Sequence, residues 1–275
     1  MDKIIIFIGV MVLAVLCGVF VYKVRKFFSF GQNPDSQKQE PRLPAPSKRI
    51  VANQAQIRGA LISRGLREIA LAQSGDDSST HFTEIAGLER WLFARGLHTT
   101  LSPEELEMIT AAPGTWEAET ARQSLRSAET LGCLCWALSL VSKIPPYDET
   151  FDAPTLLSYL HIAEENFNIE SATKLRTFDI LLQERQRADL WRWRAELQQK
   201  IAQGQKTPRG FSYSQIIALV AKSGSEHDLP IGDDFPVFGM AFRKMNTEQL
   251  TRVTAICYMR ARALDWLCGY STQPQ

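Results

Sequence analysis

The residue that first suggests chemistry is an arginine on an otherwise apolar helical face. Arg260 follows Cys257 by three positions and precedes Leu264 by four, so a helix directs its guanidinium toward the core. A guanidinium in that position needs a carboxylate partner. The sequence offers two candidates for this partner, Glu129 and Asp179.

Two interpretations of this charged cluster follow. Glu129, Asp179 and Arg260, with Arg176 beside Asp179 in the segment LRTFDI, could converge in a cleft and form the active site of an enzyme of unassigned class. The other interpretation is a lock that specifies the fold, because buried arginine and carboxylate networks are more often structural than catalytic. We favour the structural interpretation and keep the enzyme as the alternative.

Other catalytic or metal-binding patterns are absent from the sequence. It has no GxSxG motif, Walker loop, dinucleotide-binding glycine pattern or kinase signature. The four histidines lie far apart, and only His81 with Glu84 and His161 with Glu164 have a spacing that could place two ligands on one helical face. We therefore expect no metal ion and no cofactor.

The cysteines and tryptophans are expected in the core. Cys133 and Cys135 are two positions apart, which puts them on different faces of a helix, so they cannot chelate one metal ion together. With Cys257 and Cys268 they fit reduced core thiols. A sharper alternative is a groove for a partner peptide or helix, lined by exposed members of the set Trp91, Trp136, Trp191, Trp193 and Trp266.

Helical patterns dominate the segments that must position these residues. Apolar periodicity and helix breakers predict helices over 50–73, 83–96, 116–142, 174–200 and 214–222. Ser102 and Glu105 form a capping box for a short helix, and Asn246 and Gln249 form another for the last helix, which Gly269 ends. Residues 228–240 read as an irregular loop, with short strand pieces only around 235–242. We predict an all-α multi-helix globular domain over 50–275.

An apolar segment precedes this domain. Residues 4–22 form an unbroken apolar run of about nineteen residues, just long enough to cross the roughly 30 Å hydrocarbon layer of a bilayer. The run is longer than the apolar part of a signal peptide and no small-residue cleavage site follows it. We predict an uncleaved transmembrane helix within an anchor over 1–26, followed over 27–49 by a flexible linker rich in proline and polar residues.

Basic residues directly after the apolar run predict the orientation. Lys23, Arg25 and Lys26 form a collar that the positive-inside rule keeps in the cytoplasm. We expect a single-pass inner-membrane protein with its N-terminus outside and its C-terminal domain in the cytoplasm. The net charge of +1, with acids and bases interspersed, argues against nucleic acid as a partner. The expected partners are membrane lipid, through the anchor, and another protein, and no oligomeric state follows from the sequence.

Several motifs occur in an order that resembles a known family. They are WLFARGLHTTLSPEE, AETLGCLCWALSLVSKIP, LRTFDI followed by WRWRAE, PVFGMAFRKMNTEQL and RARALDWLCGY. Over about residues 50–270 the chain resembles a bacterial family of domains of unknown function, the DUF family with serial 4272. The resemblance implies no established activity. By this resemblance, Ser102 and Glu105 match the family's capped helix, Glu129 matches its acid and Trp136 its tryptophan. Arg176 and Asp179 match its charged pair, and Arg260, Leu264 and Trp266 match its closing motif.

The chain also departs from the family pattern. Met259, Ala261 and Asp265 stand where the pattern usually has Glu, His and Asn, and Arg126 stands where a Trp usually precedes the acid. The resemblance implies that any reaction these groups serve in relatives is lost here. The leading prediction is therefore a protein-interaction module acting as an adaptor, an accessory to a membrane-associated machine or an immunity-like inhibitor. A membrane-surface lipid sensor is a weaker alternative.

Overall fold

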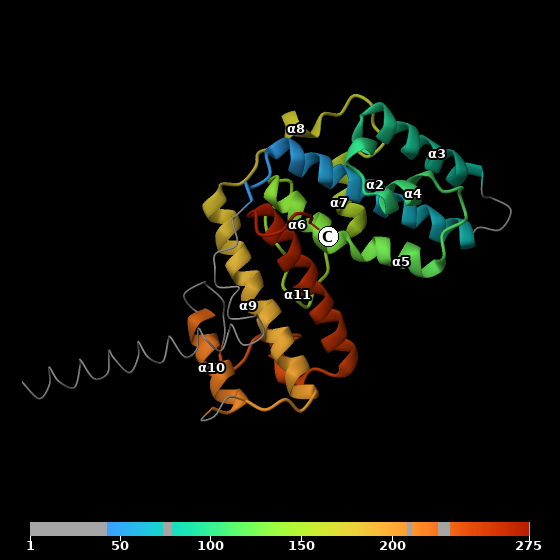
Figure 1. Cartoon of the computed structure of the whole chain (residues 1–275). Coiled ribbons are helices and arrows are strands. Elements are labelled where there is room, and N and C mark those ends of the chain that lie inside the picture. Colours follow the sequence, from blue (N-terminus) through green and yellow to red (C-terminus); the bar gives the residue numbers. More distant parts are fainter. Residues whose placement is uncertain (1–42, 74–78, 208–210, 225–231, 275) are drawn as a thin grey trace, which may run out of the picture. The chain divides into compact units, whose positions relative to one another are not determined.

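The computed structural model describes residues 43–73, 79–207, 211–224 and 232–274. The predicted anchor, its collar of Lys23, Arg25 and Lys26, and most of the predicted linker lie outside these residues. The chain divides into two units, Met1–Arg42 with Lys206–Phe211 and Leu43–Gln205 with Ser212–Gln275. The second unit contains the described helices and is mostly helical, as predicted (Figure 1). None of the helices within the described ranges is both long and apolar enough to cross a bilayer.

The first helices form where caps and periodicity predict them. Helix α2 spans Lys48–Gln73 and α3 spans Ser79–Ala94, followed by a 3-10 turn, η3, at Leu97–Thr100. Helix α4 is Pro103–Thr110. Its capping box is complete, because the Ser102 hydroxyl accepts from the Glu105 N–H at 3.1 Å and the Glu105 carboxylate accepts from the Ser102 N–H at 2.9 Å.

The prediction of one continuous helix over 116–142 is wrong. The structure has two helices there, α5 at Ala118–Arg126 and α6 at Ala128–Ala137. Near the break the Ser124 and Ser127 hydroxyls bond to backbone carbonyls, Ser124 to Ala121 and Ser127 to Ser124, an alternative to the helical ladder. Helix α6 ends well before Pro145 because Ser139 adopts a left-handed conformation with φ of 61°.

Two helices were not predicted. Helix α7, Ala153–Leu160, begins after Asp152, whose carboxylate accepts from the Thr155 N–H at 3.0 Å. The short helix α8, Ile169–Ala172, begins after Asn168, which accepts from the Ser171 N–H at 3.2 Å. Both begin with a side-chain cap that is visible in the sequence.

The C-terminal part contains α9 and α11, the two helices that contact each other most extensively. Helix α9 is Phe178–Ala202, α10 is Tyr213–Gly224 and α11 is Thr247–Leu267. Between α10 and α11, strands β1 (Pro236–Val237) and β2 (Met240–Ala241) pair antiparallel, with Val237 opposite Met240, before the 3-10 turn η5 at Phe242–Lys244. The predicted box of Asn246 and Gln249 caps α11. Helix α11 packs mainly against α9 and α6 (Figure 1).

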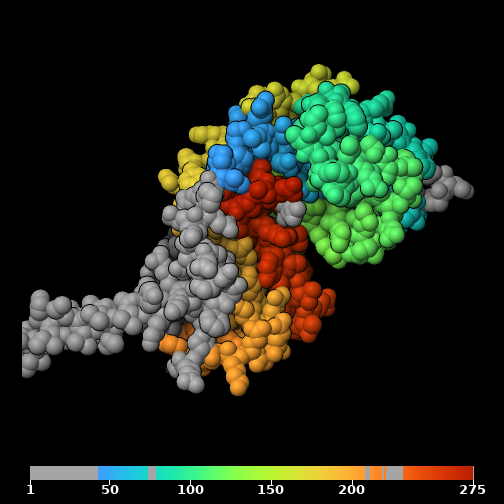
Figure 2. Space-filling model, in the orientation of Figure 1, coloured from blue at the N-terminus to red at the C-terminus, as the bar shows by residue number. Residues whose placement is uncertain are grey.

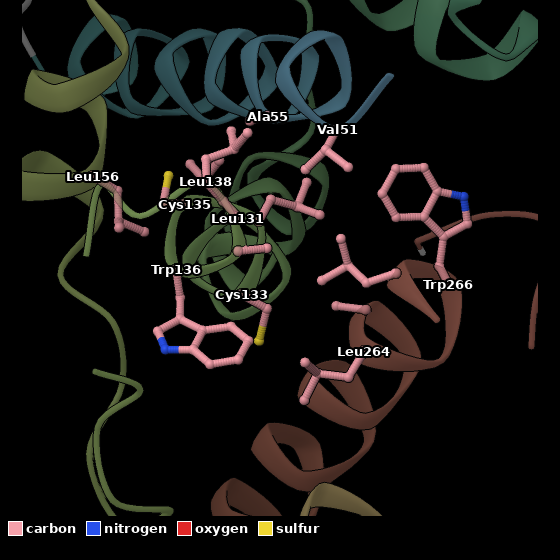
Figure 3. Close-up of a cluster of buried hydrophobic side chains, with 14 of the residues drawn as sticks. Val51, Ala55, Leu131, Cys133, Cys135, Trp136, Leu138, Leu156, Leu264 and Trp266 are labelled. Carbon is pink, nitrogen blue, oxygen red and sulfur yellow. The ribbon is translucent and has the colours of Figure 1, made fainter. Parts of the chain in front are cut away.

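The core joins the central helices. Helix α2 packs against α3, α5 and α6, and apolar side chains from α2, α6, α7 and α11 form the main cluster. Figure 3 shows Val51, Leu131, Leu156 and Leu264 of these four helices around a shared centre. Helix α6 is buried along its whole length, so it is the axis on which the neighbouring helices are positioned.

Candidate functional site

The predicted cluster forms around Arg260, and Glu129 is its carboxylate partner. Arg260 Nε donates to Glu129 Oε2 at 2.7 Å, and both side chains are buried. Its Nη1 donates to the Pro145 carbonyl at 2.6 Å and its Nη2 to the Glu149 carbonyl at 2.7 Å. The guanidinium therefore joins α11 to α6 and to the loop that leads to α7, with all its nitrogens hydrogen-bonded.

The Glu129 carboxylate is equally occupied. Its second oxygen accepts from the Phe151 N–H at 3.0 Å. Gly132, one helical turn further along α6, makes room for the Phe151 ring, because a Cβ at that position would lie 2.2 Å from it. The Arg260 guanidinium lies over the rings of Tyr147 and Phe151, with its carbon 4.9 and 5.2 Å from their centroids. This arrangement fits a structural lock and leaves no substrate-facing atom on either partner.

The other two predicted members lie apart from this pair. Asp179 is exposed in the first turn of α9, and among the described residues it forms no ion pair with Arg260 or Arg176. Arg176 Nε donates to the Trp136 carbonyl at 2.7 Å and its Nη2 to the Val141 carbonyl at 3.0 Å. Arg176 thereby caps the C-terminal end of α6. The four residues do not converge on one cleft.

Sequence reasoning missed Glu184, which lies near Arg176 and Arg260. Its carboxylate pairs with Arg187 at 3.2 Å. Burial raises the pKa of Glu184, and the charges of Arg187, Arg260 and Arg176 oppose this rise. Its three-residue spacing to Arg187 on α9 was the available signal, but that spacing is common on solvated helices.

Two more buried arginines follow the same pattern as Arg260. Arg64 on α2 pairs with Glu68 at 2.7 Å and donates to the Ala111 carbonyl at 2.8 Å, which fixes the segment after α4. Arg194 on α9 holds Asp234 through two hydrogen bonds of 2.7 and 3.1 Å. Burial alone would raise the pKa of Asp234, but its hydrogen bonds from Arg194 and from backbone N–H groups lower it overall. Each of these arginines fastens a loop to a helix.

The tryptophans do not line a groove together. Trp91, Trp136, Trp191 and Trp266 are at most 7% exposed and Trp193 is half-buried. Trp191 stacks on Tyr147 with ring centroids 4.5 Å apart, which makes it part of the core. The prediction of an interaction groove made of exposed tryptophans is thus corrected, because helical packing uses most of these rings.

The cysteines and histidines offer no metal centre in the described part of the chain. Cys133, Cys135, Cys257 and Cys268 are buried thiols. Burial raises the pKa of Cys133 and Cys257 and raises that of Cys135 to about 12. In each histidine–glutamate pair the two residues bond to each other, His81 Nδ1 to Glu84 at 3.4 Å and His161 Nδ1 to Glu164 at 3.0 Å. The second pair lies in a turn after α7 and not on a helix.

A groove that the sequence did not predict lies elsewhere on the larger unit. It has a volume of about 860 Å³ and is bounded by the start of α2, the start of α4, the α5–α6 junction, α11 and residues 272–274. Figure 2 shows this region, where the dark red end of α11 lies between the blue start of α2 and the green segment that contains α5. Its size is within the usual range of ligand-binding cavities. We call it the α4–α11 groove.

The lining of the α4–α11 groove is mixed. Ile50, Met259 and Trp266 supply apolar surface, and Arg58, Arg126 and Arg262 supply positive charge. Arg58 pairs across to Glu105 at 2.9 Å, which links α2 to α4. Most of the remaining lining residues carry hydroxyls or amides: Gln54, Thr100, Ser102, Gln123, Ser127, Thr130, Thr272 and Gln273. The groove can therefore hold a ligand by hydrogen bonds and charge with a small apolar contact.

The tail and the linker end meet beside this groove. Gly269 has a φ of 76°, and the chain turns there so that Thr272, Gln273 and Pro274 form one wall of the groove. Leu43 N donates to the Gly269 carbonyl at 3.0 Å, and a Cβ at position 269 would lie 2.1 Å from the Leu43 carbonyl oxygen. Leu43, the first described residue of the predicted linker, is thus bonded to the turn that precedes this wall of the groove.

The family of the chain follows from these features and from sequence comparison. The chain belongs to the family described as Domain of unknown function (DUF4272), whose model matches residues 67–218. The match covers α6 with Glu129 and all of α9, while Arg260 and α11 lie beyond it. A comparison with curated proteins and with solved structures found no significant match.

Proposed function

We propose that this chain is a membrane-tethered protein-interaction module whose binding site is the α4–α11 groove. The observation that carries the proposal is the groove itself, with its hydrogen-bonding and charged lining. In contrast, the Arg260 cluster is fully engaged in holding loops, and Asp179 lies outside it. A role as adaptor, accessory protein or immunity-like inhibitor agrees with a site of this kind.

We also propose the placement of the module. The apolar run over 4–22 anchors the chain in the inner membrane, and the collar of Lys23, Arg25 and Lys26 keeps the helical body on the cytoplasmic side. Because Leu43 bonds to Gly269 beside the groove, a partner bound there is held close to the first described residue of the linker. This position suits the capture of other membrane-associated proteins.

The family domain extends, in this proposal, over residues 50–270 and not only over the matched 67–218. The extension is supported by packing, because α11 contacts α9 and α6 and carries the partner of Glu129. The start of α2 likewise contributes Val51 and Ala52 to the main core cluster. A domain without these segments would expose that core.

Photocrosslinking in the native membrane tests the proposed function. A photoreactive amino acid replaces Gln123, which is exposed and lines the groove, and in the control it replaces Gln199, which is also exposed, on α9, but does not line the groove. We expect position 123 to capture a protein that position 199 does not. Identical products from both positions, or lipid alone, would contradict the proposal.

A further inference from the structure

The α4–α11 groove has a surplus of positive charge. Arg126, which lines the groove, pairs with Glu119 at 3.2 Å. The same carboxylate also pairs with Arg122 at 3.1 Å. One carboxylate thus faces two guanidiniums. Arg262, on the opposite wall, is exposed and forms no ion pair within the part of the chain that the structure describes.

The acids of the groove do not cancel this surplus. Glu105 is already bound by Arg58 at 2.9 Å and by the Ser102 N–H. Glu104 lies in the first turn of α4, where the helix dipole favours a negative charge, and backbone and Ser102 hydrogen bonds lower its pKa. Arg262 therefore remains available to an anionic ligand, and Arg126 shares the single carboxylate of Glu119 with Arg122, so its charge is only partly compensated.

A threonine with almost no exposed surface lies in the same groove. Thr130, in the first turn of α6, lines the groove although only 1% of it is exposed. Its hydroxyl forms no hydrogen bond to any residue that the structure describes, and it is not among the fully buried polar atoms, so its small accessible surface opens to the groove. Arg58 Nε is a buried polar atom on the groove lining that has no hydrogen-bond partner in the described structure. Both are suited to hydrogen-bond a ligand.

From these observations we infer the chemistry of the partner: the groove takes a peptide segment that carries aspartate or glutamate. Its carboxylates pair with Arg126 and Arg262, a backbone or side-chain group bonds to Thr130, and one apolar side chain contacts Met259 and Trp266. Guanidinium and carboxylate groups match in planar geometry, which makes arginine the suitable residue for this recognition. The inference rests on the proposed function and adds the class of ligand.

Selection from a random peptide library tests the inference. Phage-displayed dodecapeptides are selected on the full-length protein in nanodiscs and, in parallel, on the double variant R126E/R262E. We expect the wild type to enrich sequences rich in Asp and Glu, and the double variant to bind the synthesised winning peptide about tenfold more weakly or worse. R122E is the matched control, because Arg122 has the same exposure and the same Glu119 partner as Arg126 but does not line the groove. It should leave affinity within about twofold.

A second variant tests the Thr130 hydroxyl. Thr130→Val keeps the side-chain shape and removes a group that has no partner in the described structure, so thermal unfolding should be unchanged while the winning peptide binds several-fold more weakly. Enriched peptides without acids, or acidic peptides unaffected by R126E/R262E, would overturn the ligand class and leave a peptide-binding module. The absence of any peptide whose binding depends on a groove residue would overturn the module as well.

Discussion

Arg260 Nε and Glu129 Oε2 lie 2.7 Å apart although the two residues are 131 positions apart in the sequence. Neither side chain is more than 4% exposed. This contact joins the last helix to the central helix, and the same guanidinium holds the loop between α6 and α7. The pair is therefore a determinant of the fold.

Replacing this arginine should be severely destabilising. Arg260→Ala leaves the Glu129 charge buried without its partner and frees the loop carbonyls, so we expect a loss of about 3–5 kcal/mol in the free energy of unfolding. Arg262→Ala, an exposed site on the same helix, should cost less than about 0.5 kcal/mol. Urea unfolding followed by circular dichroism measures both. A fully stable R260A protein would instead favour the enzyme alternative.

The pair of Arg194 and Asp234 predicts a pH-dependent difference in stability. Because the folded state lowers the pKa of Asp234 below 3.8, its stabilising contribution is complete above that value and is lost as pH falls through the lower, folded pKa. Asp234→Asn should cost about 3 kcal/mol at pH 7. The gap between wild type and variant should narrow as pH is lowered below about 4. A gap that stays constant down to pH 2 would refute this role.

The buried cysteines should resist alkylation in the folded protein. Burial raises the pKa of Cys133 and Cys257, and that of Cys135 to about 12, so few thiolates form at pH 8 and none is accessible. Iodoacetamide labelling followed by mass spectrometry should modify these three sites only after urea is added. Rapid labelling of Cys133 in the native protein would show that α6 is not in the core.

The proposed membrane placement makes a topology prediction. The full chain should stay with the membrane pellet in alkaline carbonate, and deletion of residues 4–22 should release it. Protease added to spheroplasts should leave the helical body intact until the membrane is opened. Digestion of the body from outside would reverse the orientation and exclude a cytoplasmic partner.

Local signals allowed much of the fold to be predicted from the sequence. The capping boxes at Ser102 and Asn246 depend on residues three positions apart, and both form. The apolar face of α11 likewise indicated that Arg260 is buried, and the sequence offered Glu129 among two candidate partners. The break between α5 and α6 escaped prediction because neither proline nor glycine stands at Ser127, and only serine hydroxyls compete there with the helical hydrogen bonds.

The groove could not be predicted in the same way. Its walls come from α2, α4, α6, α11 and the tail, and residues such as Gln54, Gln123 and Arg262 look individually like ordinary helix surface. Thr130 is conspicuous only once its burial and missing partner are known. Sites assembled from distant segments carry no local sequence period, so three-dimensional placement was required to find this one.

Hydrogen exchange of the full-length protein with the winning peptide tests the central claim most directly. The peptide should slow exchange in the segments that bound the groove, residues 100–105, 123–130 and 259–266, and should leave α10 unchanged. Thr130→Val should weaken this protection without altering exchange in the free protein. Protection confined to α9 and α10, with none around Thr130, would contradict the assignment of the binding site.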